Sequence, residues 1–166
     1  MGCAFGVAVV ILGLSLPRPA AADNESGPGL TLNLTFDARH SVRRAVTLAL
    51  VTLARPGCSR IFEDFELPDG RTPRNELDRL GIGAETLIRG LVFVDGSSDP
   101  VCRNGRAVLT TTPGSRLIRV CPGFAQLDDP SLRAVLVLHE SLHALGLGEN
   151  PPSSRDITNR VEHLCW

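Results

Sequence analysis

Residues 139 to 143 read His-Glu-Ser-Leu-His, a pattern whose side chains could bind a metal ion and activate a water molecule. On an α-helix, His139 and His143 are four positions apart and lie on one face, about 40° apart. Two neutral imidazoles so placed can bind one zinc ion. Glu140 lies about 100° round the helix from His139, where its carboxylate can contact the activated water without binding the metal. The pattern therefore predicts a zinc site with Glu140 as general base.

The segment around this motif is apolar on nearly every side of the expected helix, which indicates a buried helix. Burial of two histidines and a carboxylate without partners is costly, so a shared metal ion would explain all three together. The competing interpretation is an incidental match in which these side chains are solvated, and the apolar surroundings argue against it. The apolar residues are Leu132, Val135, Leu136, Val137, Leu138, Leu142 and Leu145.

A catalytic zinc ion needs a third protein ligand and an open fourth position. The run from His139 to Glu149 resembles the metzincin consensus HExxHxxGxxH of the zincin-type metallopeptidases, with Gly146 at the turn and Glu149 where the third histidine would be. The resemblance implies zinc-dependent peptidase activity, with Glu149 as the third ligand. The methionine-containing turn of that family is missing, since the only methionine is Met1.

Two other residues are alternative third ligands. The stretch from Cys121 to Phe124 is similar to the aspzincin peptidases, and this similarity implies an aspartate ligand further on, a part that Asp156 could take. His163 could bind the metal, or could stabilise an oxyanion in place of the tyrosine that many zinc peptidases use, because the chain has no tyrosine. The alternative for His163 is a half-exposed histidine on a terminal helix.

The elements that position the motif follow from periodicity and turn residues. The motif helix is expected over residues 130–145, after two aspartates that suit its first turn, with a glycine-rich end. Residues 106–112 and 116–121 predict the two strands of a hairpin around a Pro-Gly-Ser turn. A last short helix, capped by a serine, is expected over about 153–165.

The first half of the chain predicts the remaining elements. Alternating apolar residues over 30–36 favour a short strand, and apolar residues at helical spacing between Asp37, as N-cap, and Leu53 favour a helix. Residues 61–83 are expected to be loop and short helix, and the apolar run 91–94 a buried strand. The sequence thus predicts an α+β fold: a small sheet with a hairpin packed on the buried motif helix, an N-terminal helix and a short C-terminal helix.

Composition and the first residues indicate an exported globular protein. The chain has 166 residues, 43% of them hydrophobic, with a formal net charge of −1, and no basic patch that would indicate a nucleic-acid partner. Residues 1–22 resemble a signal peptide in their apolar stretch and final run of alanines, and an uncleaved anchor is the alternative. We expect cleavage after Ala22, a single domain over 23–166, no stable membrane anchor afterwards, and a periplasmic or extracellular location.

Four cysteines remain in the expected domain: Cys58, Cys102, Cys121 and Cys165. In an exported domain they predict two disulfides, with three possible connectivities. We expect Cys102–Cys121 to staple the hairpin and Cys58–Cys165 to tie the C-terminus to the end of the first helix. No Cys-x-x-Cys pair is present, so a thiolate zinc site is not expected.

These patterns together predict an exported zinc metallopeptidase that hydrolyses peptide bonds in a peptide or protein substrate. An extended substrate could add to residues 116–121 if that strand is an exposed edge. One alternative is an exported, disulfide-stabilised binding domain in which a structural zinc has four protein ligands, with His163 as the fourth. Another is an inactive zincin relative. The tail, residues 146–154, resembles small exported bacterial proteins of unassigned activity, which implies export but no substrate.

Overall fold

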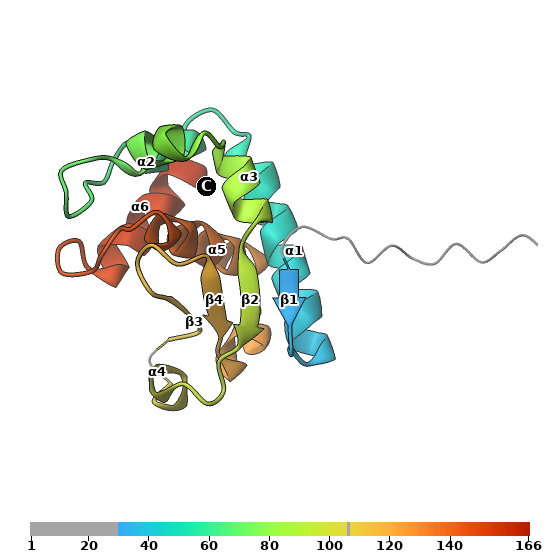
Figure 1. Cartoon of the computed structure of the whole chain (residues 1–166). Coiled ribbons are helices and arrows are strands. Elements are labelled where there is room, and N and C mark those ends of the chain that lie inside the picture. Colours follow the sequence, from blue (N-terminus) through green and yellow to red (C-terminus); the bar gives the residue numbers. More distant parts are fainter. Residues whose placement is uncertain (1–29, 106) are drawn as a thin grey trace, which may run out of the picture.

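The computed structural model describes residues 30–105 and 107–166, so the signal peptide expected over residues 1–22 lies outside the described residues. Within the described part, the chain forms the expected α+β fold, a small sheet with helices packed against it. Figure 1 shows the sheet in front of α1 (Phe36–Leu53) and α5 (Pro130–Ala144). The helices α2 (Pro73–Leu80), α3 (Ala84–Arg89) and α6 (Ser154–Cys165) lie towards the end of the sheet at which its parallel strands begin.

Four short strands form a mixed sheet in the order β1-β2-β4-β3. β1 (Leu30–Leu32), β2 (Val92–Asp95) and β4 (Leu117–Val120) run parallel, whereas β3 (Leu109–Thr111) pairs antiparallel with β4. The expected hairpin is therefore confirmed, with shorter strands. The prediction that residues 116–121 could be an exposed edge is wrong, because β4 lies between β2 and β3, and the edge strands are β1 and β3.

Burial explains why β4 lies inside the sheet. Ile118 and Val120 of β4 are buried, and so is Phe93, which lies opposite Ile118 in the register of β2. The edge strand β3 instead carries Thr110 and Thr111, which are only partly buried. Alternation along a single strand does not show which neighbours it pairs with, so the sequence left the order of the strands open.

The first helix, α1 (Phe36–Leu53), begins earlier than expected because Thr35 rather than Asp37 is its N-cap. The Thr35 hydroxyl accepts a hydrogen bond from the backbone N–H of Ala38 at 3.3 Å. Asp37 lies inside the first turn, where its negative charge is favourable beside the helix dipole. The expected cap is therefore wrong, since the threonine before it already supplies the non-helical backbone and the hydroxyl of a cap.

The expected strand over residues 30–36 is also too long. β1 ends at Leu32, and Asn33 follows in the left-handed region with φ 55°. This turn directs Leu34 into the core, where it is 7% exposed, and leaves Phe36 at the start of α1. The alternation of apolar residues over 30–36 therefore spans a strand, a turn and the start of a helix, and does not mark one continuous strand.

The segment 61–83, expected to be loop and short helix, contains α2 (Pro73–Leu80). Two further short helices flank it: the 3₁₀ helix η1 (Cys58–Phe62), which ends inside it, and α3 (Ala84–Arg89), which follows it. A capping box begins α2, since Thr72 and Asn75 exchange side-chain to backbone hydrogen bonds at 3.0 and 3.2 Å. Helices of one or two turns give too little periodicity to be recognised in sequence.

The two C-terminal helices lie where they were expected. α5 (Pro130–Ala144) carries the His-Glu-Ser-Leu-His motif and is capped by Asp129, whose carboxylate accepts from the N–H of Ser131 at 2.7 Å. α6 (Ser154–Cys165) begins with a capping box around Ser153. α5 contacts α1, α6 and the edge strand β3, so the helix with the motif is surrounded by other elements.

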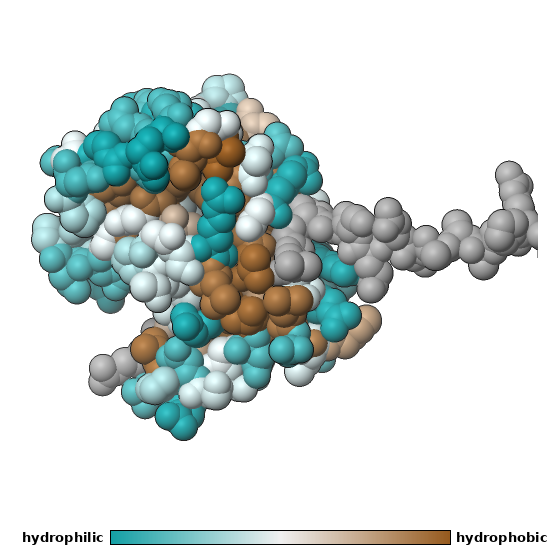
Figure 2. All heavy atoms as spheres, in the orientation of Figure 1, coloured by the Kyte–Doolittle hydropathy of each residue, from teal (hydrophilic) through white to brown (hydrophobic). Residues whose placement is uncertain are grey.

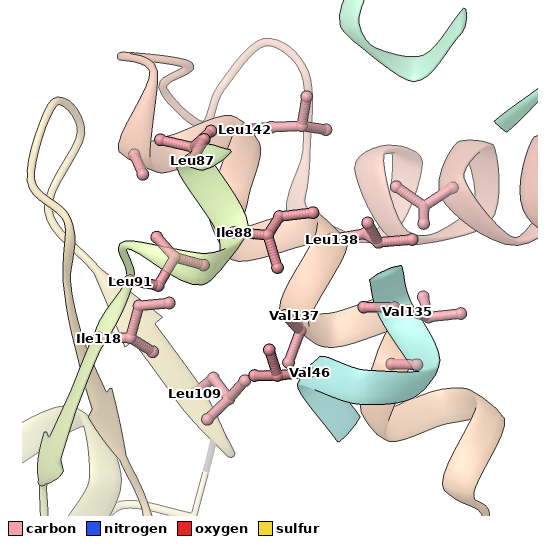
Figure 3. Packing of buried hydrophobic residues seen from close by; sticks show 14 of the residues in the cluster. Val46, Leu87, Ile88, Leu91, Leu109, Ile118, Val135, Val137, Leu138 and Leu142 are labelled. Atoms are coloured by element: carbon pink, nitrogen blue, oxygen red, sulfur yellow. The ribbon is translucent and has the colours of Figure 1, made fainter. Parts of the chain in front are cut away.

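The hydrophobic core lies between the sheet and the helices behind it (Figure 3). Val46 from α1, Ile88 from α3, Ile118 from β4 and Val137 and Leu138 from α5 are all fully buried in it. The opposite face of the sheet is less covered, with Leu32 44% and Leu117 37% exposed. Figure 2 shows hydrophobic residues gathered over the strands and hydrophilic ones over α2.

Both expected disulfides are present. Cys58–Cys165 joins η1 to the end of α6. Cys102–Cys121 joins α4 (Pro100–Arg103) to the residue after β4, just before the 3₁₀ helix η2 (Pro122–Gln126), so it does not link the two hairpin strands to each other as expected. Two disulfides are typical of proteins that fold in an oxidising, exported environment. Across residues 30–105 and 107–166, no helix combines the length and the apolar character that crossing a membrane requires.

Candidate metal centre

Two histidine rings from α5 and one carboxylate from the segment after it converge beside β3. The Nε2 atoms of His139 and His143 are 2.9 Å apart. Oε1 of Glu149 lies 3.5 Å from Nε2 of His143 and 3.8 Å from Nε2 of His139. The ligand atoms of the three residues all lie within 4.8 Å of one another, so this group could hold a metal ion.

The partners of the other ring nitrogens orient the two histidines. Nδ1 of His143 lies 2.6 Å from the carbonyl oxygen of Leu147. A carbonyl only accepts, so this Nδ1 carries the proton and Nε2 of the neutral ring presents a lone pair. Nδ1 of His139 lies 3.0 Å from the hydroxyl of Thr158, which can either accept or donate. Both Nε2 atoms can therefore present lone pairs to one cation, with their rings held by outer hydrogen bonds.

The end of α5 explains how Glu149 reaches the histidines. The N–H of Leu147 donates to the carbonyl of Leu142 at 3.2 Å, and the N–H of Gly146 donates to the carbonyl of His143 at 2.8 Å, which is a Schellman arrangement. Gly146 adopts φ 104°, a conformation that favours glycine. The chain turns back here, which brings the Leu147 carbonyl to the His143 ring and Glu149 to the metal-ligand group.

The β3–β4 hairpin is tied to the same helix end. The N–H of Gly114, in the hairpin turn, donates to the carbonyl of His143 at 2.8 Å. Gly114 adopts φ 82°, so the tight turn also requires a residue that tolerates a positive φ. The hydrogen bond fixes the edge strand next to α5, and its acceptor is the backbone carbonyl of His143, one of the three residues that could bind a metal.

Burial sets the protonation of His139. His139 is only 3% exposed and His143 only 5% exposed. Burial, and to a lesser extent the electrostatic influence of the nearby His143 ring, lowers the pKa of His139 from 6.5 to about 3. The His139 ring is therefore neutral near pH 7, which is the form that binds metal ions.

Glu140 is a buried carboxylate beside these rings and is 5% exposed. Desolvation raises the pKa of Glu140 to about 7. The electrostatic influence of the His143 ring and the hydroxyl of Thr111 oppose this effect, and the charge of Glu149 adds to it. Oε2 of Glu140 and Oγ1 of Thr111 are both buried, and neither has a hydrogen-bond partner of normal geometry among the described residues. The unsatisfied Oε2 can accept a hydrogen bond from a water molecule and take its proton.

The group opens onto a cleft of about 280 Å³ between the edge strand and the segment after α5. One wall comes from β3 and the residues before it, and the other from α5, the following segment and the start of α6. Only a few side chains converge in it, which suits a bound ligand that is oriented by polar groups. The lining residues are Val101, Ala107, Leu109, Thr110, Thr111, His139, Glu140, His143, Glu149 and Ser154.

The two alternative third ligands do not join this group. Asp156 belongs to the capping box of α6, where its carboxylate accepts from the Ser153 hydroxyl at 2.7 Å. His163 lies exposed in the last turn of α6. Among the described residues, the possible metal-ligand group around α5 therefore consists of His139, His143 and Glu149.

Three partners of the site were missing from the sequence interpretation: the Thr158 hydroxyl, the Leu147 carbonyl and the Thr111 hydroxyl. Thr158 is 19 residues from His139, and no local spacing links them. The carbonyl of Leu147 follows from the glycine-containing helix end, so the motif did contain a signal for it. Thr111 could be placed only once the edge strand of the sheet was known.

Models of known protein families, curated proteins and solved structures were compared with this chain, and none of them matches it.

Proposed function

We propose that this protein is an exported zinc metallopeptidase that hydrolyses peptide bonds in a peptide or protein substrate. The observation that carries the proposal is the convergence of the two Nε2 atoms, 2.9 Å apart, with the Glu149 carboxylate, while a carbonyl and a hydroxyl partner their Nδ1 atoms. Two imidazoles and one carboxylate form a donor set typical of catalytic zinc.

The number of donors favours an enzyme over a binding domain with a structural zinc. Structural zinc sites usually have four protein ligands, whereas catalytic sites have three and keep a position for water or substrate. Three donors converge in the described part of the chain, and the fourth ligand that a structural site would need, His163, is exposed on α6 outside the group. The cleft at this group gives a substrate room to approach.

Each residue then has a distinct part. His139, His143 and Glu149 would hold the zinc, which would supply Lewis acidity towards the scissile carbonyl and the attacking water. Glu140, with Oε2 buried and unsatisfied, accepts the proton of the water and passes it to the leaving amine. In the metal-free protein, burial raises the pKa of Glu140 to about 7; a zinc ion bound nearby would lower this pKa and favour the ionised carboxylate, which is the form that accepts a proton.

A peptide substrate is supported by the edge strand. β3 pairs with β4 on one side only, and its residues line the cleft. An extended peptide can add to such an edge through backbone hydrogen bonds. β3 thus takes the part first expected of residues 116–121, and its Thr111 lies beside Glu140.

The test compares zinc content and hydrolysis in three oxidised proteins purified without chelator: wild type, Glu140→Gln and Glu149→Gln. We expect about one zinc per wild-type chain and cleavage of a mixed peptide library, followed by mass spectrometry. Glu140→Gln should keep the zinc and lose cleavage by about 100-fold or more, as expected for loss of general acid–base catalysis. Glu149→Gln should lose both. Undiminished turnover by Glu140→Gln, or a wild type that binds no zinc after reconstitution, would refute the proposal.

A further inference from the structure

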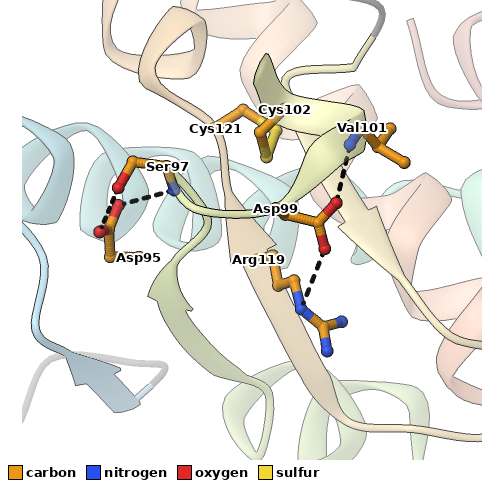
Figure 4. The surroundings of a disulfide bond; sticks show 7 residues. All are labelled: Asp95, Ser97, Asp99, Val101, Cys102, Arg119 and Cys121. Carbon is orange, nitrogen blue, oxygen red and sulfur yellow. Dashed lines mark hydrogen bonds and ion pairs between the residues drawn. A yellow bond between two sulfur atoms is a disulfide. The ribbon is translucent and has the colours of Figure 1, made fainter. Parts of the chain in front are cut away.

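Two interactions hold the four-residue helix α4 against the sheet, and a third caps its N-terminus (Figure 4). The Asp99 carboxylate caps it by accepting from the N–H of Val101 at 2.8 Å. The other carboxylate oxygen of Asp99 forms an ion pair with Nε of Arg119 on β4 at 3.4 Å. The disulfide Cys102–Cys121 then fixes the helix covalently to the residue after β4.

Close packing at Gly96 restricts this segment further. A Cβ atom on Gly96 would lie 2.9 Å from Sγ of Cys102, 3.0 Å from Cβ of Arg119 and 3.1 Å from the carbonyl oxygen of Val120. The N–H of Gly96 donates to the same carbonyl at 2.9 Å, so the backbone passes directly over the end of β4. The loop between β2 and α4 therefore has little freedom to move away from the sheet.

The rigid helix presents a large apolar side chain to the metal cleft. Val101 is 45% exposed, whereas Cys102 next to it is 7% exposed. Val101 lines the cleft of the metal-ligand group together with Ala107 and Leu109. This end of the cleft is aliphatic, while the end at the histidines is polar.

Strand geometry gives the distance between the two ends. Thr111 lies beside Glu140, and Leu109 is two residues earlier on β3, which corresponds to about 7 Å along a strand. Ala107 precedes Leu109 by two more residues. A peptide extended along β3 therefore meets the aliphatic end of the cleft about two to four residues from the bond that reaches Glu140.

We propose that α4 is a specificity element, and that Val101, Ala107 and Leu109 form a subsite for an aliphatic side chain of the substrate. The preferred substrates are peptides with Val, Leu, Ile or Met at one fixed position, two to four residues from the cleaved bond. This inference rests on the proposed peptidase function and adds the substrate class. An aliphatic side chain is stabilised when it leaves water and packs against this wall, and the Asp99–Arg119 ion pair and the Cys102–Cys121 disulfide keep the wall in place.

The test is the cleavage profile of a randomised peptide library for the zinc-loaded wild type, Val101→Ala, Val101→Asp and Val51→Asp. Val51, on α1, is 60% exposed and lines a different cavity, so Val51→Asp is a matched control for the same change at the surface. Zinc content and both disulfides are measured in every variant to establish that each one folds.

We expect the wild type to favour an aliphatic residue at one position by about 10-fold or more in kcat/KM over glycine there, the usual range for an apolar pocket. Val101→Ala should reduce this preference, and Val101→Asp should replace it by a preference for Lys or Arg at the same position. Val51→Asp should keep the wild-type profile. Cleavage without an aliphatic preference, or a profile unaltered in Val101→Asp, would overturn the subsite while the peptidase function stands. A zinc-loaded wild type that cleaves no peptide would refute the peptidase function, and the subsite with it.

Discussion

Replacement of Thr158 by valine removes the hydroxyl that partners Nδ1 of His139 while leaving a side chain of nearly the same shape. When Nε2 of His139 binds a metal, its Nδ1 carries the proton and needs an acceptor, and the Thr158 hydroxyl at 3.0 Å is that acceptor. In the metal-free protein, the proton can instead lie on Nε2 and point at Nε2 of His143, 2.9 Å away. The loss of the hydroxyl should therefore weaken the metal-bound state more than the metal-free fold.

The magnitude follows from burial. His139 is 3% exposed, so water does not readily replace the lost acceptor, and a buried unsatisfied donor costs about 1–3 kcal/mol. A cost in this range corresponds to zinc affinity about 10–100-fold weaker, the usual effect of losing an outer partner of a metal-binding histidine. The free energy of unfolding of the chelator-treated protein should change by less, within about 1 kcal/mol.

The assay is competition for zinc against a chromophoric chelator at fixed pH. Thr158→Ser keeps the hydroxyl and should bind zinc about as tightly as the wild type. Thr86→Val is the control, because Thr86 is exposed on α3. If Thr158→Val binds zinc as tightly as the wild type, or Thr158→Ser as weakly as Thr158→Val, the reasoning about the His139 tautomer is refuted.

Three further predictions concern stability and the helix end. Replacing Cys58 and Cys165 by serine should lower the free energy of unfolding by about 4–5 kcal/mol, whereas the same change at Cys102 and Cys121 should lower it by about 3 kcal/mol. The reason is that the first disulfide closes a loop of 107 residues and the second a loop of 19, and a longer loop restricts the unfolded chain more. Urea unfolding measures both effects. In the chelator-treated protein, the pKa of His139, lowered to about 3 from 6.5, should reduce stability as the pH falls below 6.5, whereas the pKa of Glu140, raised to about 7 from 4.5, should reduce stability as the pH rises from 4.5 to 7. The two effects oppose each other in the wild type, so its thermal midpoint should change little between pH 5 and 6.5. In Glu140→Gln only the effect of His139 remains, so the thermal midpoint should rise as the pH rises over this range. A Glu140→Gln midpoint that does not change with pH would contradict the lowered pKa of His139. Gly146→Ala, at φ 104°, should lower stability by about 1 kcal/mol and weaken zinc binding through the displaced end of α5, and unchanged zinc affinity would argue that this end does not orient the site.

The chemistry-bearing part of the molecule could be predicted because its signals are local. The i, i+4 spacing of the histidines, the apolar surroundings of α5 and the glycine after it all act within one helix and its end. Gly146 and Glu149 therefore lie where the motif suggested, and Glu149 joins the histidines. Both disulfide pairings were also predicted, although Cys58 lies on η1 and Cys102 on α4, two short helices that the periodicity had not located.

The arrangement of the sheet could not be predicted in the same way. Residues 116–121 were considered as an exposed edge, but β4 lies inside the sheet. Its position depends on which strands pair in the folded protein, and the alternation of apolar residues along one strand does not encode this pairing. The cap at Thr35 was missed because Asp37, two positions later, is also a residue type that commonly caps a helix. Thr158 lies on a different helix from the histidine that it contacts, and only the packing of α6 on α5 brings them together.

The Cys58–Cys165 disulfide closes a covalent ring around most of the molecule, with the metal-ligand residues, three strands and the cleft inside it. A single cut of the backbone anywhere between these cysteines leaves two fragments that stay joined. A peptidase that nicks its own copies, in the turn at Gly70 or between α4 and β3, would therefore migrate as one chain without reductant and as two with it. Gels run both ways would show whether such self-cleavage occurs, and a nicked molecule would keep His139, His143 and Glu149 together on the same C-terminal fragment.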